Sequence, residues 1–189
     1  MGSIVNPDWY YEIKYQQVEA MKEAYSVIRE ADAKIEENLG RVYKPVESYL
    51  AEDSEILVLT YGGIYGTLQT AVDLLRSEGL RVGALRLRLW RPFPARDLKT
   101  LVEDAKTLIV VDRAISYGAS IEGPVALETI AALYREGLYP AIASFIAGIG
   151  GRPVSEDDFR GMVKKALELG ERALKIGSIH WGVRGVEYE

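Results

Sequence analysis

The first candidate for ligand chemistry is a glycine-rich stretch between a predicted strand and a predicted helix. It reads Thr-Tyr-Gly-Gly-Ile-Tyr-Gly-Thr over residues 60–67, and its candidate ligand-binding residues are Gly62, Gly63, Gly66 and Thr67. Glycines at such a position let backbone N–H groups approach a phosphate at a helix N-terminus. The spacing is not that of a dinucleotide fingerprint, and no lysine follows as a phosphate-binding loop requires. A tight strand-to-helix turn capped by Thr67 is therefore the favoured interpretation.

A second candidate is the arginine-rich stretch over residues 85–94, which begins within a predicted strand. Arg86 and Arg88 alternate with leucines, so the two arginines share one face of the strand. A sheet covered on both sides should not bury bare guanidinium groups. We therefore expect this strand to lie near an edge, or its arginines to meet carboxylates of a helix or of another subunit. Arg91 stands where a dinucleotide site has its ribose-binding acid, which keeps an NADP site open as an alternative.

Two further polar stretches follow predicted strands. Asp112 and Arg113 come at the carboxyl end of a strand, where open α/β sheets place their ligands. They could bind a small polar ligand, but an ion pair that fixes the following loop is the commoner arrangement. Three glycines and Arg152 lie in residues 147–153, where a plain turn is favoured over an anion site. The candidate interface residues of the whole chain are Arg86, Arg88, Trp90, Arg91, Phe93, Asp112 and Arg113.

Composition excludes several classes of chemistry. The 189 residues include no cysteine and a single histidine, His180, so a disulfide, a thiolate nucleophile and a cysteine-ligated zinc or iron–sulfur cluster are ruled out. A net charge of −5 argues against a nucleic-acid partner. No apolar run reaches the roughly 18–20 residues of a membrane span. The N-terminus lacks the basic and apolar regions of a signal peptide, so we expect a cytoplasmic location without membrane contact.

The predicted elements alternate between strand and helix four times. Strands are expected at residues 55–60, 81–90, 107–112 and 141–146, and helices at 65–78, 95–104, 121–136 and 155–175. Ser155 and Asp158 have the spacing of a capping box at the start of the last helix. The alternation predicts a three-layer α/β/α fold with a mostly parallel sheet of about four or five strands.

A long helix is predicted ahead of the sheet, over residues 11–39, with Gly40 as its stop. Its apolar residues follow three-four spacing, broken by Asp32: Val18, Met21, Tyr25, Ile28, Ile35 and Leu39. So narrow a stripe belongs to a helix laid along another surface, either its own domain or a neighbouring molecule. We expect an N-terminal arm over residues 1–50, an α/β domain over 51–176 and an irregular tail over 177–189.

Five motifs in order along the chain carry a family resemblance. They occupy residues 10–17 (Tyr-Tyr-Glu-Ile-Lys-Tyr-Gln-Gln), 87–94 (Leu-Arg-Leu-Trp-Arg-Pro-Phe-Pro), 110–113 (Val-Val-Asp-Arg), 148–152 (Gly-Ile-Gly-Gly-Arg) and 182–185 (Gly-Val-Arg-Gly). Together they resemble the α subunit of pyruvate:ferredoxin oxidoreductase, also called pyruvate synthase. The matching region is the one that is similar to the C-terminal domain of transketolase.

The resemblance implies a parent enzyme that converts pyruvate, coenzyme A and oxidised ferredoxin to acetyl-CoA, carbon dioxide and reduced ferredoxin. That family uses thiamine diphosphate, Mg²⁺ and iron–sulfur clusters. This chain has no Gly-Asp-Gly metal–diphosphate motif and no cysteine, so we expect it to bind none of these cofactors and assign it no catalytic residue.

The expected role is a non-catalytic assembly domain. Its expected partners are other subunits of the oxidoreductase and further copies of itself, with ferredoxin reached only through the whole complex. The alternative is a stand-alone NADP- or coenzyme A-binding domain.

Overall fold

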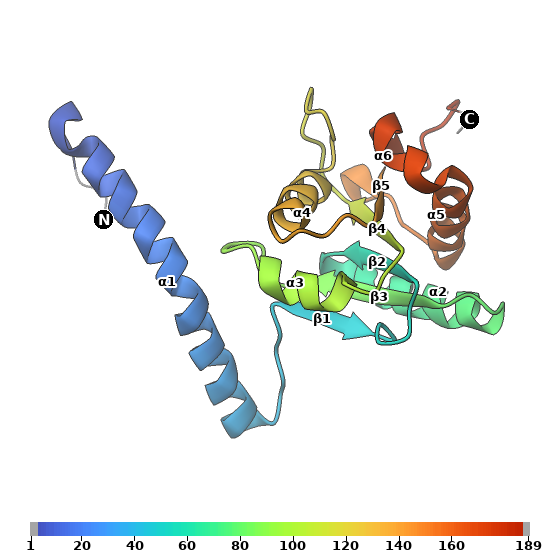
Figure 1. The fold of residues 1–189 in the computed structure, drawn as a ribbon, viewed down its shortest axis with the longest axis horizontal. Coiled ribbons are helices and arrows are strands. Elements are labelled where there is room, and N and C mark those ends of the chain that lie inside the picture. Colours follow the sequence, from blue (N-terminus) through green and yellow to red (C-terminus); the bar gives the residue numbers. More distant parts are fainter. Residues whose placement is uncertain (1–3, 187–189) are drawn as a thin grey trace. The chain divides into compact units, whose positions relative to one another are not determined.

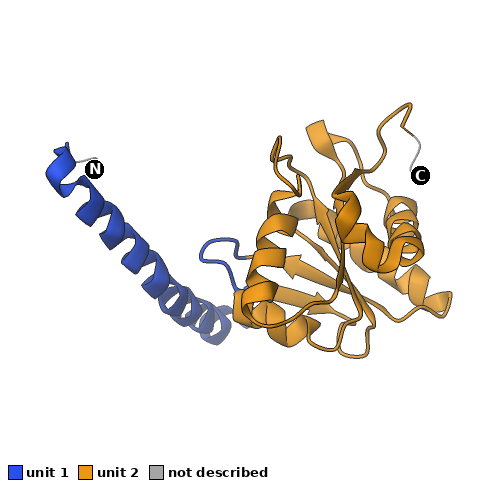
Figure 2. Ribbon diagram, turned by 45° about the horizontal axis from the view of Figure 1, so that its top comes forward, with its two compact units in different colours: residues 1–45, 89–94 blue, residues 46–88, 95–189 orange. Residues whose placement is uncertain are grey.

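A computed structural model describes residues 4–186, and the chain divides into two compact units (Figure 2). Unit 1 comprises residues 1–45 and 89–94, and unit 2 comprises residues 46–88 and 95–189. In unit 1, helix α1 (Pro7–Leu39) begins with proline in its first turn, where the missing N–H is not needed. The helix ends at Gly40, whose left-handed conformation lets its N–H bond to the Glu36 carbonyl. The long N-terminal helix predicted from the sequence is thus confirmed, with its start four residues earlier than expected.

Unit 2 contains a six-stranded sheet in the order β1-β3-β2-β4-β5-β6 (Figure 1). The strands are β1 (Val46–Tyr49), β2 (Ile56–Thr60), β3 (Val82–Leu87), β4 (Thr107–Asp112), β5 (Ala141–Ile146) and β6 (Ser178–His180). All neighbouring strands run parallel except β1, which pairs antiparallel with β3. The predicted mostly parallel α/β sheet is confirmed, and two short strands that were not predicted are added at its edges.

Helices cover both faces of this sheet. They are α2 (Tyr65–Ser77), α3 (Ala95–Val102), α4 (Pro124–Arg135), α5 (Glu156–Leu169) and α6 (Ala173–Ile176). Helices α2 and α5 pack together over one face, and α3 and α4 lie on the other (Figure 1). The central strands are buried along almost their whole length, as expected for parallel strands covered on both sides. The fold therefore has the three α/β/α layers that the sequence predicts.

The core is built by side-chain alternation along the strands. Ile109 and Val111 of β4 and Phe145 of β5 point toward α2 and α5, where they meet Leu68 and Phe159. Each of these side chains is fully or almost fully buried. Burying an aliphatic or aromatic side chain of this size stabilises a fold by roughly 1.5–3 kcal/mol. The α2–α5 layer is therefore a main source of the stability of unit 2.

The fold corrects two predictions about the C-terminal segment. The helix predicted to run from residue 155 to 175 ends at Leu169, because Gly170 adopts a positive φ of 52°. A 3-10 turn (Gly170–Arg172) and the short α6 follow it. The tail from residue 177 was expected to be irregular, yet Ser178–His180 forms strand β6 beside β5. Three residues are too few to show the alternation that marks a strand in sequence.

Candidate functional site

The carboxyl ends of β2, β4 and β5 bring three sequence-predicted stretches to the same edge of the sheet. These stretches are the glycine turn after β2, Asp112 and Arg113 after β4, and the glycines after β5. They are linked directly, because the Tyr61 hydroxyl accepts a 2.9 Å hydrogen bond from the backbone N–H of Arg113. The Arg113 guanidinium in turn donates to the Gly148 carbonyl at 3.4 Å. The topology thus assembles the edge where open α/β sheets hold their ligands.

The glycine turn after β2 is a one-turn 3-10 helix, Gly62–Ile64, that leads into α2. Gly62 has a φ of 70°, so this position favours glycine for its backbone conformation. A β-carbon at Gly63 or Gly66 would meet nothing within 4 Å. The prediction that Thr67 caps the turn is wrong, because α2 begins at Tyr65 and has no side-chain cap. The turn conformation accounts for Gly62 alone. Ligand binding by Gly62, Gly63, Gly66 and Thr67 stays a prediction.

The two arginines of the β3 stretch meet a carboxylate, as one of the two sequence alternatives proposed. Glu47 of β1 lies opposite Arg86 in the antiparallel register and accepts from Arg86 at 3.3 Å and from Arg88 at 3.4 Å. The Arg86 guanidinium also lies over the Tyr65 ring, 5.6 Å from its centroid, and burial raises the pKa of Tyr65 to about 12. Strand β3 is not the edge strand; β1 covers it and supplies the acid.

The aromatic segment after β3 belongs to unit 1. Trp90 and Phe93 are half-buried, and the Arg91 guanidinium stacks on the Trp90 ring at 5.3 Å while donating to the Trp90 carbonyl at 2.9 Å. A cation over an indole face is a favourable contact that fixes the long arginine side chain. Their role as interface residues stays a prediction.

Asp112 does not form the expected ion pair with Arg113. Its carboxylate is fully buried and accepts 3.0 Å hydrogen bonds from the backbone N–H groups of Val125 and Ala126, in the first turn of α4. Burial raises the pKa of Asp112 to about 6, against the opposite effect of these two hydrogen bonds. The ion pair fails because Asp112 is the last residue of β4 and its side chain points under α4, whereas Arg113 turns toward Gly148. Asp112 therefore holds a helix N-terminus.

A second polar cluster joins β5, β6 and the residues before α4. The Ser178 hydroxyl accepts from the N–H groups of Glu122 and Gly123 at 3.0 and 3.1 Å and contacts the Ser144 hydroxyl at 2.8 Å. His180 Nε2 lies 2.5 Å from Glu122 Oε2. His180 thus links strand β6 to the loop before α4. Sequence reasoning missed Ser144, Ser178 and Glu122, since nothing in their spacing signals that they meet.

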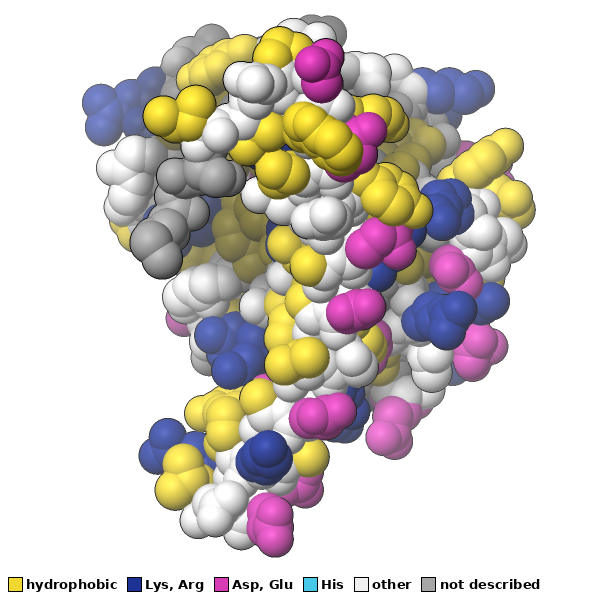
Figure 3. All heavy atoms as spheres, turned by 90° about the vertical axis from the view of Figure 1, so that its left-hand side faces the viewer, with side chains coloured by type: hydrophobic (Ala, Val, Ile, Leu, Met, Phe, Trp, Pro, Cys, Tyr) yellow, Lys and Arg dark blue, Asp and Glu magenta, His cyan; other side chains and the backbone are white. Residues whose placement is uncertain are grey.

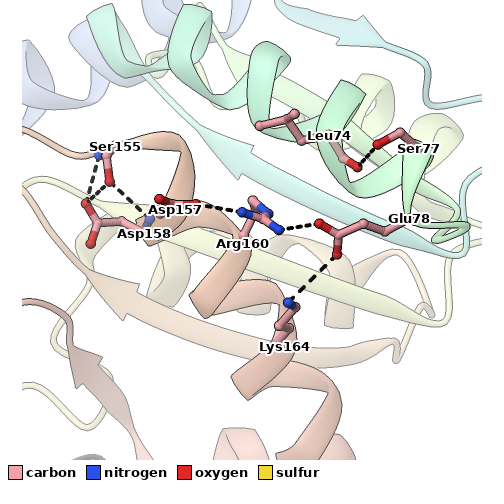
Figure 4. A network of polar contacts seen from close by, with 8 residues as sticks. All are labelled: Leu74, Ser77, Glu78, Ser155, Asp157, Asp158, Arg160 and Lys164. Carbon is pink, nitrogen blue, oxygen red and sulfur yellow. Dashed lines mark hydrogen bonds and ion pairs between the residues drawn. The ribbon is translucent and has the colours of Figure 1, made fainter.

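A polar network also closes the α2–α5 layer (Figure 4). Arg160 of α5 contacts both Asp157 and Glu78, and Lys164 reaches Glu78 at 3.8 Å. At the start of α5 the predicted capping box is confirmed, with Ser155 and Asp158 bonding each other's backbone N–H. The network orients two helices and offers no reactive group.

One groove in unit 2 lies away from these residues. A groove of about 670 Å³ opens near the start of β5 and is lined by Val102, Ile130, Tyr134, Leu138, Tyr139 and Leu174, among others. The rings of Tyr134 and Tyr139 meet edge to face, 5.6 Å apart. The groove is mostly apolar and lies at the opposite strand ends from Asp112.

Among residues 4–186, no group of three or more histidine, cysteine or acidic side chains is placed to hold a metal ion. In the same described part, no helix is both long and apolar enough to cross a membrane.

Comparison with known proteins shows which family the chain belongs to. The family model for pyruvate:ferredoxin oxidoreductase core domain II matches residues 54–159, more than half of the chain. The pyruvate synthase subunit PorA of Pyrococcus horikoshii is 39% identical over 95% of this chain and 45% of its own length. The ketoisovalerate oxidoreductase subunit VorA of the same organism is 35% identical over 95% of this chain and 46% of its own. The chain therefore spans less than half the length of these relatives.

Solved structures agree on the fold. A split-gene transketolase, described as an inactive β4 tetramer, superposes with a TM-score of 0.54 at 15% identity, covering 69% of this chain and 45% of that one. This likeness supports the transketolase-like architecture predicted from the sequence. By the match of its α/β unit, the chain belongs to the pyruvate:ferredoxin oxidoreductase core domain II family.

Proposed function

We propose that this chain is the non-catalytic assembly domain of a multi-subunit 2-oxoacid:ferredoxin oxidoreductase that acts on pyruvate. The observation that carries the proposal is the match of residues 54–159 to core domain II, together with relatives that are themselves named as subunits. Pyruvate is preferred as the substrate because the pyruvate synthase relative is more similar than the ketoisovalerate one, at 39% against 35% identity. In this proposal the complex works in the cytoplasm. Ferredoxin binds the assembled complex and not this chain alone.

The cofactors proposed for the complex do not fit this chain. An iron–sulfur cluster needs cysteine thiolates, and the chain has none. In the family that the sequence resembles, thiamine diphosphate and its metal ion are held at a Gly-Asp-Gly motif, and this chain has no such motif. We therefore place both cofactors on other parts of the enzyme and assign no reaction step to a residue here.

What this chain supplies is a set of rigid surfaces. The carboxyl edge of the sheet is stiffened by the Tyr61–Arg113 and Asp112–α4 contacts. The side chains of Arg86 in β3 and of Arg88 just after it are still 38% and 36% exposed although both pair with Glu47. A half-exposed arginine pair on a fixed strand suits a charged contact with a neighbouring subunit.

Reconstitution tests the proposal. This chain would be co-expressed with the remaining subunits from the same genome, and pyruvate- and coenzyme A-dependent reduction of ferredoxin would be measured. We expect the chain to co-purify with them and the activity to require it. Activity that is complete without the chain, or a failure to associate, would overturn the proposal.

Two matched variants sharpen the test. Arg88→Gln removes a cation that pairs with Glu47, and Lys164→Gln removes a cation that pairs with Glu78 on the α2–α5 side. We expect only Arg88→Gln to weaken co-purification. Calorimetry with NADP and coenzyme A addresses the stand-alone nucleotide-binding alternative, for which a saturable heat from the isolated chain would be the positive result.

A further inference from the structure

Helix α1 carries an apolar seam over residues 18–39 that is interrupted at Asp32. The middle residues of the seam, Tyr25, Ile28 and Ile35, are half-buried, and its end residues are more exposed. None of its 33 residues is buried. Val18, Met21 and Leu39 keep 51, 47 and 68% of their surface exposed. Apolar and acidic side chains run along the helix in the space-filling view of Figure 3. Most of the stability of a helix in a protein comes from packing of its apolar face. We therefore expect the apolar seam of α1 to pack against a partner surface.

The spacing of the seam identifies the kind of partner. Counting Val18 as the first position of a heptad, Tyr25 and Leu39 repeat that position, and Met21, Ile28 and Ile35 fall at the fourth. A stripe restricted to these two positions is the narrow seam of a coiled coil, whereas a helix packed on a globular core shows a broader stripe. The seam over residues 18–39 therefore fits another helix better than a sheet or a flat domain surface.

Asp32 interrupts the seam and decides the orientation of a self-pair. It occupies a first heptad position. In a parallel pair of identical helices the two Asp32 carboxylates would face each other at the same level. In an antiparallel pair with its two-fold axis near residue 30, Asp32 lies opposite Ile28 of the second copy. Arg29 of the second copy then lies beside the Asp32 carboxylate. Charge complementarity thus favours the antiparallel arrangement.

The flanking residues agree with this register. Tyr25 comes opposite Ile35 of the second copy, and Met21 comes opposite Leu39. On one flank, Lys22 lies level with Glu36 of the second copy. Glu36 and Glu37 stand in the last turn of α1, which has no basic residue, so they face the negative end of the helix dipole. Lys22 from a second copy would offset that repulsion; its present partner, Glu19, forms an exposed pair of the kind that contributes little.

The other flank is small and uncharged. It carries Ala24, Ala31 and Asn38, with Ala31 meeting its own counterpart near the axis. Small residues there let two helices approach closely.

We propose that α1 pairs antiparallel with α1 of a second copy of this chain through the residue 18–39 seam, forming a symmetric dimer. This inference is independent of the proposed subunit role and concerns the isolated chain as well as any complex that contains it.

The first test compares two neighbouring substitutions by sedimentation equilibrium on the full chain. Ile28→Glu places a carboxylate in the seam, and Val27→Glu places the same carboxylate one residue away, at a side chain that is 61% exposed. We expect the chain and Val27→Glu to dimerise, and Ile28→Glu to raise the dimer dissociation constant about a hundredfold, because both copies would bury a charge. Circular dichroism controls for helix loss. A monomer at every concentration, or equal effects of the two variants, would overturn the proposal.

The second test reads the orientation. The chain has no cysteine, so single cysteines can be introduced without background. Ala31→Cys should form a disulfide-linked dimer on mild oxidation, because residue 31 lies near the two-fold axis. Val18→Cys should not, because its counterpart lies at the far end of the paired segment. Efficient linkage through Val18→Cys and not Ala31→Cys would establish a parallel pair and contradict the antiparallel one.

Discussion

Gly123 is positioned directly against the carboxylate of Asp112. A β-carbon on residue 123 would collide with Asp112 Oδ2 and come within 3.0 Å of the Ser144 hydroxyl. Asp112 can therefore reach the Val125 and Ala126 N–H groups only because the residue before Pro124 has no side chain. This contact ties the end of β4 to the start of α4.

Gly123→Ala should destabilise the chain by roughly 1–3 kcal/mol, because the extra methyl must displace a buried, doubly hydrogen-bonded carboxylate. Gly66→Ala is the matched control. Gly66 lies in α2 with open space around its missing side chain, and alanine there should stabilise by about 0.5–1 kcal/mol. Urea unfolding of both variants measures the difference, and equal changes in the two would contradict the fit of Gly123 to Asp112.

Asp112 should make stability fall with rising pH over a defined window. Its pKa in the folded chain is raised from 3.8 to about 6 by burial, so the folded state binds its proton more tightly than the unfolded state does. The stabilising contribution is complete below pH 3.8 and is lost as the pH rises through 6. A shift of this size corresponds to about 3 kcal/mol.

Asp112→Asn isolates this effect, because carboxylates with lowered pKa values, such as Asp53 and Asp158, change stability in the opposite direction. The free energy of unfolding of the parent minus that of Asp112→Asn should decrease between pH 4 and pH 6.5. A difference that stays flat or increases would show that the Asp112 pKa is not raised.

Gly161→Ala should destabilise the chain although alanine is the better helix former. Gly161 lies in α5 under the Trp181 ring, and a β-carbon there would lie 2.5 Å from the ring. Trp181 would lose its 3.0 Å hydrogen bond to Asp158 and its edge-to-face contact with Phe145. We expect a loss of about 1–3 kcal/mol and a red-shifted tryptophan emission; a variant as stable as the parent with unchanged emission would refute the contact.

Arg76→Lys should lower the free energy of unfolding although the substitution keeps the positive charge. The Arg76 guanidinium donates to the Val82 carbonyl at 2.7 Å and to the Leu50 carbonyl at 2.8 Å, and it pairs with Asp53 at 2.6 Å. A lysine ammonium group cannot replace the planar guanidinium in all three of these contacts. We therefore expect the free energy of unfolding to fall by about 2 kcal/mol.

Arg135→Lys is the control for Arg76→Lys, because Arg135 also lies in the last turn of its helix, α4, and is exposed. Its expected effect is within about 0.5 kcal/mol. Thermal or urea unfolding of the two variants side by side decides the outcome, and indistinguishable stabilities would argue against the role of Arg76.

The amino-acid sequence by itself determined the layers and most of the element boundaries. Strands β4 and β5 begin and end where their apolar runs do, because a parallel strand buried on both faces has to be apolar throughout. The capping box of α5 and the Gly40 stop of α1 were also readable, since both are local backbone chemistry. The absence of cysteine excludes disulfides and cysteine-ligated metal centres.

Tertiary structure alone decided which polar groups meet. Asp112 was expected to pair with its neighbour Arg113, but it bonds residues 13 and 14 positions further along. Glu47 lies opposite Arg86 because β1, a strand too short to predict, pairs antiparallel with β3. Ser178 contacts Ser144 only because β6 joins the sheet. The physical reason is that burial makes a polar group take whichever partner the packed sheet brings within reach, and chain proximity does not reveal that partner.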